Sequence, residues 1–127
     1  MLTRVMIAVL VLFAGLGTWM AWSYQQPSVS AEPFEAAKWS AGAGLAEGIG
    51  DPGCVRGAMA LDLLQRKRLP GMTAGEVHAL LGTPARYGPE WTYALGQCSG
   101  YGWQHSGLVV RFSPADGVIA ASFQHAP

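Results

Sequence analysis

A long uncharged apolar run near the start of the chain constrains the fold more than any other feature. After Arg4, about eighteen residues from Val5 to Trp22 contain nothing more polar than Thr18, and no further charge occurs before Glu32. A helix of this length can cross the hydrocarbon core of a bilayer, and it is longer than the usual apolar core of a cleaved signal peptide. Residues 1–24 are therefore predicted to form a membrane anchor or a signal peptide.

The flanks of this run predict its orientation. Arg4 favours the cytoplasm for the N-terminal end, whereas Trp19, Trp22 and Tyr24 favour the membrane–water interface at the other end. The bulk of the protein is then expected in the cell envelope, anchored in the inner membrane and facing the periplasm. The stretch Val29 to Ala31 also has the small-x-small form that signal peptidase accepts, so cleavage after Ala31 would give a periplasmic or secreted protein.

Composition limits the number of domains and the class of partner. A chain of 127 residues is at most one domain long, and its net charge is 0 with only 13% charged residues. Binding to nucleic acid depends largely on cations that neutralise phosphates. Nucleic acid is therefore not an expected partner, whereas the membrane is, through the N-terminal helix.

The next segment, residues 25–50, is predicted to be a flexible linker. It is rich in Ala, Gly, Ser and Pro, and Phe34 and Trp39 are its only large apolar residues. Such a composition buries too little surface to offset the entropy of ordering the backbone. We expect the segment to be a mobile tether that can pin one aromatic ring to the folded domain, which is predicted to span residues 51–127.

The folded domain is predicted to begin with a helix from about Pro52 to Arg68, with Asp51 as its N-cap. Its apolar residues fall on two arcs, so the helix requires two apolar partners. Asp62 is spaced to form an ion pair with Arg66 one turn later. The basic residues of the last turn suit the negative end of the helix dipole, and they are too few for a typical lipid-binding cluster.

A second helix is specified by the stretch LPGMTAGEVHALLGTP, residues 69–84. Pro70 and Gly71 suit the centre of a type II turn, and Thr73 with Glu76 has the spacing of a capping box. Gly82 is expected in the left-handed conformation that ends helices, and a proline follows it. His78 lies beside the apolar face and is interpreted as an ordinary flanking residue.

After this helix the apolar period changes from 3.6 to 2, which predicts three strands in EWTYALG, LVVRF and VIAASF. The turn SPADG, residues 113–117, has the composition of an antiparallel hairpin. The earlier connection, residues 97–107, is predicted to be a long loop that contains Tyr101, Trp103 and His105. Such a loop is either a recognition surface or a lid that packs on the sheet.

Cys54 and Cys98 are the only cysteines, and an even count in an exported protein favours a disulfide. The bond would join the start of the first domain helix to the end of the first strand. In a domain with so small a core, this crosslink would contribute substantially to stability. Two unpaired structural thiols are the alternative.

The order of two helices and three antiparallel strands, with "GMT..EV..LLG.P" opening the second helix, resembles the BamE/SmpA/OmlA family of outer-membrane assembly lipoproteins. The resemblance covers about Met59 to Phe123. Its most specific residues are Gly71, Met72, Thr73, Glu76, Val77, Leu81, Gly82 and Pro84. It implies a small α+β domain, two helices on a three-stranded β-meander, that assists the insertion of β-barrel proteins.

This chain departs from the family pattern. It lacks the lipobox cysteine, it carries the apolar run instead, and its cysteine pair is not a family requirement. The same architecture is similar to the β-lactamase-inhibitor-protein fold, which implies the alternative of a periplasmic binding or inhibitor protein. Fold similarity alone does not choose between these functions.

The sequence predicts neither catalysis nor a cofactor or metal site. Its acidic residues occupy salt-bridge, capping, strand-start and turn positions, and no His is spaced near a Cys or Ser as an activated nucleophile would be. The glycines do not have the spacing of a phosphate-binding loop. The function is therefore predicted to be protein binding, to an envelope protein of unknown identity.

The predicted contact points for this protein partner come from two segments. Interface anchors are enriched in Tyr and Trp, which favours Tyr101 and Trp103. The turn at Leu69, Gly71 and Met72 is the second predicted contact. The alternative is that both rings of the loop pack on the sheet and serve stability.

Overall fold

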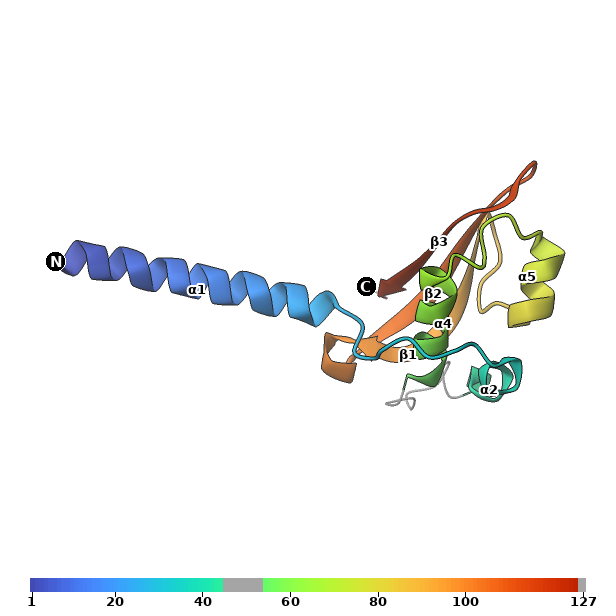
Figure 1. Cartoon of the computed structure of the whole chain (residues 1–127), viewed down its shortest axis with the longest axis horizontal. Coiled ribbons are helices and arrows are strands. Elements are labelled where there is room, and N and C mark those ends of the chain that lie inside the picture. The colour runs from blue at the N-terminus through green and yellow to red at the C-terminus, as the bar shows by residue number, and fades with distance from the viewer. Residues whose placement is uncertain (45–53, 126–127) are drawn as a thin grey trace.

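The computed structural model describes residues 1–44 and 54–125, whose arrangement is shown in Figure 1. In chain order the elements are α1 (Leu2–Gln25), α2 (Ala36–Ala41), α4 (Val55–Gln65), α5 (Ala74–Leu81), β1 (Glu90–Ser99), the 3-10 turn η1 (Gly100–Gly102), β2 (Gln104–Ser113) and β3 (Gly117–His125). An apolar N-terminal helix, further helices and a three-stranded antiparallel sheet confirm the predicted α+β fold class.

Helix α1 extends away from the rest of the chain as a single rod (Figure 1). Its most apolar window has a mean hydropathy of 2.1, and 0% of that window is buried against protein. A helix of 24 residues is about 36 Å long, which exceeds the roughly 30 Å of a bilayer's hydrocarbon core. This helix is therefore compatible with a signal sequence or a membrane anchor.

The segment after α1 pins an aromatic ring to the domain, as expected, but over residues 26–44 it does not form the predicted flexible linker. Trp39, on α2, is only 1% exposed, and its indole N–H donates a hydrogen bond to the carbonyl oxygen of Leu81 at 2.8 Å. Nearer to α1, the Ser28 amide donates to the carbonyl oxygen of Cys98 at 2.6 Å. This part of the segment is thus packed against the domain, and the rest of the predicted linker lies outside the described residues.

Helix α4 is shorter than the predicted helix over residues 52–68. It begins at Val55, because Cys54 has a left-handed φ of 46° that does not continue a helix. It ends at Gln65, and Lys67 has a positive φ of 50°. The predicted caps Asp51 and Pro52 lie outside the described residues. The predicted ion pair is present, with Arg66 Nε 2.7 Å from Asp62 Oδ1.

The predicted disulfide joins Cys54 to Cys98, with their Cα atoms 5.3 Å apart. It connects the start of α4 to the end of β1, as expected, and a disulfide is typical of an exported protein. A Cβ added at Gly57 would lie 2.1 Å from Cys54 Sγ and 2.6 Å from Cys98 Sγ. Glycine is required at this helical position because the disulfide lies directly on it.

The expected two partners of α4 are the sheet on one side and α2 on the other. Arg56, on α4, is only 5% exposed and joins these layers. Its Nε donates to the carbonyl oxygen of Trp39 at 2.8 Å, its guanidinium lies 4.3 Å from the centre of the Trp39 ring, and Nη1 donates to the carbonyl oxygen of Ala94 at 3.2 Å. A buried cation of this kind is tolerated because backbone oxygens satisfy it.

Helix α5 begins at the predicted N-cap. Thr73 is the N-cap, and its Oγ1 accepts a hydrogen bond from the Glu76 amide at 3.2 Å. The helix ends at Gly82, whose φ is positive at 78°, but its ψ of −158° differs from the left-handed cap that was predicted. The Gly82 carbonyl oxygen instead accepts a hydrogen bond from the Tyr93 hydroxyl at 3.0 Å, which ties the end of α5 to β1.

The sheet has the order β1-β2-β3, and both pairs are antiparallel. The strands extend further than predicted, so residues 97–107 are not a long loop but the end of β1, the turn η1 and the start of β2. Register shifts between Ala94 and Gly96 and between Gln97 and Ser99 interrupt the period-2 pattern there. The predicted hairpin at residues 113–117 is present, with Gly117 at a φ of 70°.

The core lies between the helices and one face of the sheet. Its largest fully buried side chains are Trp39, Tyr93, Met59, Leu63, Leu69, Leu81, Leu95 and Leu108.

 These side chains belong to one hydrophobic cluster, and the opposite face of the sheet carries mainly small and polar residues. The domain therefore buries one face of its sheet and leaves the other open, as antiparallel sheets commonly do.

Candidate partner-binding surface

The predicted contact turn, Leu69 to Met72, is a type II turn that pairs with β3. The Met72 amide donates to the carbonyl oxygen of Leu69 at 3.1 Å, and Gly71 has a φ of 85°. The Gly71 amide donates to the carbonyl oxygen of Val118 at 2.9 Å, and the Val118 amide donates to that of Met72 at 2.8 Å. These two hydrogen bonds hold the turn against the start of β3.

This geometry corrects the prediction for one of the contact residues. Leu69 is 0% exposed and belongs to the core, so its side chain cannot reach a partner. Met72 packs partly against the core, whereas Gly71 is exposed. Of the three predicted residues in the turn, only Gly71 and part of Met72 are accessible.

The other predicted contacts, Tyr101 and Trp103, are 63% and 79% exposed. They are not the lid on the sheet that was the alternative. They also lie at the other end of the sheet from the Leu69–Met72 turn, because the start of β2 follows η1 whereas Phe112, near its end, pairs with Val118. Eight residues of strand separate these positions by about 26 Å. The two predicted contact segments therefore do not form one surface.

The feature that sequence reasoning missed is the free edge of the sheet. β3 is an outer strand, and beyond Val118 no backbone hydrogen bond joins its outer edge to another segment within residues 1–44 and 54–125. Natural proteins usually protect such edges with charged residues, proline or a covering element. Residues 117–125 contain no Asp, Glu, Lys, Arg or Pro, and the Ile119 side chain is 51% exposed. The absence of charge from VIAASF and its place as the last strand of a meander were visible in the sequence, but which segments cover its outer side was not.

The solvent-facing side of the sheet next to this edge is hollowed and lined by both small and longer polar side chains. A hollow of about 330 Å³ lies between Arg86 and the residues Thr92, Ala94, Ser106, Gly107, Val109, Gln124 and His125. Arg86 reaches this face because its backbone pairs with Thr92 on β1. The hollow therefore ends at β3, where an added strand would extend it.

The structure also brings together a Ser–His pair that sequence reasoning did not predict. Ser99 Oγ lies 2.7 Å from His125 Nδ1, and Ser106 Oγ lies 3.3 Å from Ser99 Oγ. His125 Nε2 contacts the carbonyl oxygen of Gln25, which can only accept, so Nε2 carries the proton and Nδ1 accepts from the Ser99 hydroxyl. The separation of 26 residues between Ser99 and His125 explains why no local motif indicated this contact.

An activated serine requires such a base, but it also requires access to a substrate. Ser99 is 0% exposed, and His125 is held by a backbone carbonyl at the end of α1. The arrangement ties the ends of β1 and β3 to the residue that ends α1. These contacts therefore have a structural role.

Three other polar residues considered in the sequence, Asp62, Glu90 and His78, have structural partners. Asp62 accepts from the Phe34 amide at 3.2 Å in addition to pairing with its helical neighbour. Glu90 accepts from Arg111 Nε at 2.7 Å across the strands, and the His78 ring packs edge-on against Trp91. Among the residues that the structure describes, no group of three or more His, Cys, Asp or Glu is placed to hold a metal ion.

Comparisons with protein-family models, with curated proteins and with solved structures find no match for this chain. No relative therefore assigns its function. The resemblance to the BamE/SmpA/OmlA family rests on the residues around α5 and on the order of the elements.

Proposed function

We propose that the protein is an exported, membrane-tethered and non-catalytic module that binds another envelope protein. In this proposal α1 is retained in the inner membrane, with Arg4 on the cytoplasmic side and the domain in the periplasm. The resemblance described above favours an accessory role in the assembly of envelope or outer-membrane proteins. Among the described residues, Ser99 and Ser106 are the serines in hydrogen-bond contact with a histidine, and both are buried. Their burial supports a non-catalytic function.

Retention of α1 is supported by the contacts that precede the candidate cleavage site after Ala31. Ser28 donates a backbone hydrogen bond to Cys98, and Val29 packs against the core. Gln25, the last residue of α1, accepts from His125. Cleavage after Ala31 would remove Gln25, Ser28 and Val29, and with them these contacts. A signal peptide that is discarded has no need to complete the fold of the mature protein.

The observation that carries the binding function is the unprotected edge of β3. A partner can add an extended segment to such an edge, because the exposed backbone N–H and C=O groups supply main-chain hydrogen bonds. The accessible part of the Gly71–Met72 turn would then lie at one end of the added strand. We therefore assign partner binding to the edge from Ile119 to His125.

The register identifies which backbone groups of β3 are free. The Thr92 amide donates outward to the carbonyl oxygen of Arg86 at 3.0 Å, so its neighbours on β1 bond to β2. In an antiparallel pair, the amides of successive residues point alternately toward and away from the neighbouring strand. Followed through the residue pairs of β1 with β2 and of β2 with β3, this alternation directs the Ala121 amide away from β2. Proline at this position removes an outward donor without breaking the bonds between β2 and β3.

The test compares two variants of the full-length protein in membranes. Ala121→Pro should abolish crosslinking to the partner that co-purifies with the wild-type chain. The matched control Ala121→Val adds a side chain of similar size and keeps the amide, so it should retain crosslinking. Equal crosslinking of the proline and valine variants, both folded by circular dichroism, would contradict binding at this edge.

Processing is tested separately by the intact mass of the protein recovered from cells. The proposal requires a mass that includes α1 and a domain that resists extraction from membranes at high pH. A mature chain that starts at Glu32 and is soluble would contradict the tether. That result would favour the alternative, a periplasmic or secreted binding or inhibitor protein, for which the small residues of Val29 to Ala31 are the supporting observation.

A further inference from the structure

The turn between β1 and β2 lies beside the end of α1 that is nearest to the domain (Figure 1). The rings of Tyr24 and Tyr101 meet edge to face, with their centres 5.7 Å apart. Gly100 makes this approach feasible, because a Cβ at that position would lie 2.8 Å from Tyr24 Cζ. The turn is therefore held beside the last turn of α1, at the same position along the helix axis.

The two large rings of this turn are not explained by stability. Tyr101 is 63% exposed, and Trp103 is 79% exposed. Tyr101 also adopts a left-handed φ of 57°, a conformation that is strained for a residue with a side chain. A strained backbone that presents an exposed aromatic ring points to a role in binding.

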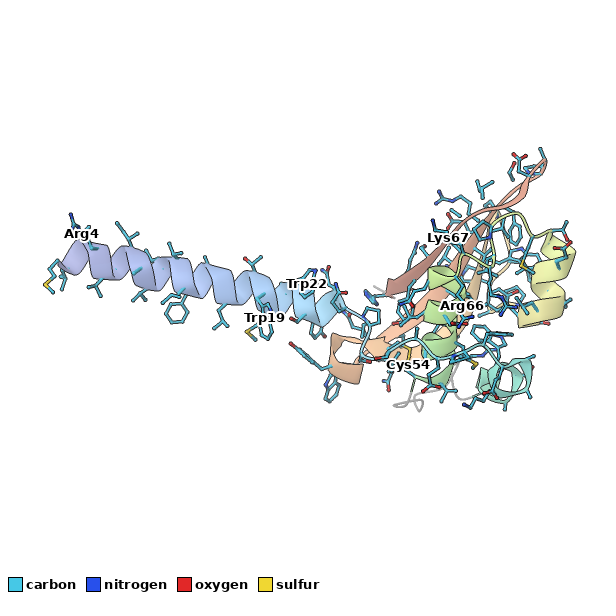
Figure 2. All side chains as sticks on the ribbon, viewed as in Figure 1. Arg4, Trp19, Trp22, Cys54, Arg66 and Lys67 are labelled. Carbon is cyan, nitrogen blue, oxygen red and sulfur yellow. A yellow bond between two sulfur atoms is a disulfide. The ribbon has the colours of Figure 1, made fainter. Side chains whose placement is uncertain are left out.

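The position of these rings along α1 indicates what they contact. Figure 2 shows Arg4 near one end of α1 and Trp19 and Trp22 near the end closest to the domain. Arg4 and Tyr24 are about 30 Å apart along a helix, which matches the thickness of the hydrocarbon core. Tyr24 therefore lies at the membrane–water interface when α1 spans the bilayer, and the Tyr101 ring beside it lies at the same depth.

We propose that Tyr101 and Trp103 insert into the headgroup region of the lipid leaflet from which α1 emerges. This inference rests on the proposed function, because it requires that α1 is retained in the membrane. Tyr and Trp are the residues that favour this interface, and the turn from Gly100 to Trp103 carries no charge. The domain then rests on the bilayer through the η1 end of its sheet, in addition to being tethered by α1.

The test uses the full-length chain in phosphatidylcholine vesicles whose acyl chains carry bromine at defined depths. Bromine quenches tryptophan emission on contact. Subtracting the emission of Trp103→Phe from that of the wild type isolates the contribution of Trp103. Trp91→Phe is the matched control, because Trp91 lies on β1 at the end of the sheet away from η1. Trp22→Phe reports on the anchor itself.

We expect shallow bromines to remove most of the Trp103 emission and deep bromines to remove little, while the Trp91 emission stays unchanged. Trp103 emission as insensitive as that of Trp91, with Trp22 quenched, would overturn lipid insertion and leave the anchor intact. Insensitive emission from both Trp22 and Trp103 would overturn the membrane tether as well. Unquenched Trp103 combined with loss of partner crosslinking in Trp103→Phe would assign the turn to a protein partner and overturn the lipid contact.

Discussion

Truncation of Trp39 tests whether residues 26–44 belong to the cooperative fold. The side chain is 1% exposed, and its indole N–H donates to the end of α5. Replacing a large buried ring by alanine costs about 3–5 kcal/mol, so Trp39→Ala should lose that amount of unfolding free energy. Trp39→Phe keeps most of the apolar volume but leaves the Leu81 carbonyl without its donor, which should cost about 1–3 kcal/mol.

The difference between the two variants is measurable as a shift in melting temperature. For a domain of 60–100 residues each kcal/mol corresponds to about 4–8 °C, so Trp39→Ala should melt more than about 12 °C below the wild type. Urea unfolding of the full chain in detergent micelles, followed by near-ultraviolet circular dichroism, gives the free energies. A residue in a flexible spacer would change stability by less than about 0.5 kcal/mol. A change that small in Trp39→Ala would refute the packing of this segment against the domain.

Three further measurements probe the disulfide, the helices and the core. Cys98→Ala should lower the unfolding free energy by about 4 kcal/mol, as expected for a crosslink between residues 44 apart, and free thiols in the unreduced wild type would contradict it. Gly57→Ala should destabilise because its Cβ would lie 2.1 Å from Cys54 Sγ, whereas Gly75→Ala on α5, with its nearest neighbouring atom at 3.9 Å, should stabilise by up to about 1 kcal/mol; equal effects would rule out the clash. Burial raises the pKa of Tyr93 above its ordinary value, so its contribution to stability is present below about pH 10 and is lost as the pH rises further. Tyr93→Phe should therefore reduce the alkaline loss of stability in denaturation curves, and an unchanged loss would exclude Tyr93 as its cause.

Local signals in the sequence predicted those elements whose structure is decided locally. The start of α5 depends on Thr73 and the Glu76 amide, which are three residues apart, and the hairpin at residues 113–117 depends on one turn. The disulfide followed from counting cysteines in an exported chain. In each case the interacting residues were close in sequence or, for the disulfide, were the only two cysteines of the chain.

Elements decided by distant contacts were predicted wrongly or missed. The start of α4 differs from the predicted one because Cys54 is left-handed, a conformation that no helix signal in the sequence indicated. Trp39 donates its hydrogen bond to Leu81, 42 residues away. Its segment therefore packs against the domain although its composition is typical of a flexible linker. The β-bulges near Gly96 and Ser99 likewise broke the period from which the strands were predicted.

The candidate site shows the same limit, because an edge is a property of the sheet and not of a strand. The uncharged stretch that became β3 was recognised as the last strand of a meander, but whether another segment covers its outer side depends on distant contacts. Among the described residues, backbone hydrogen bonds reach that side only at Val118, from the Gly71–Met72 turn. Tyr101 and Trp103 were recognised as candidate anchors from residue type. Their position beside α1 depends on the contact between Tyr101 and Tyr24, which lies 77 residues earlier in the chain.

The two proposals together constrain the partner. The free edge of β3 begins beside the Gly71–Met72 turn and ends at His125, which contacts Gln25 at the end of α1. If α1 spans the membrane as proposed, the edge runs from the distal end of the domain to the level of the bilayer surface, over about 24 Å for seven residues of strand. A segment that pairs along the whole edge must itself reach the bilayer surface. This geometry favours a partner that is embedded in or attached to the same membrane over one that diffuses freely in the periplasm.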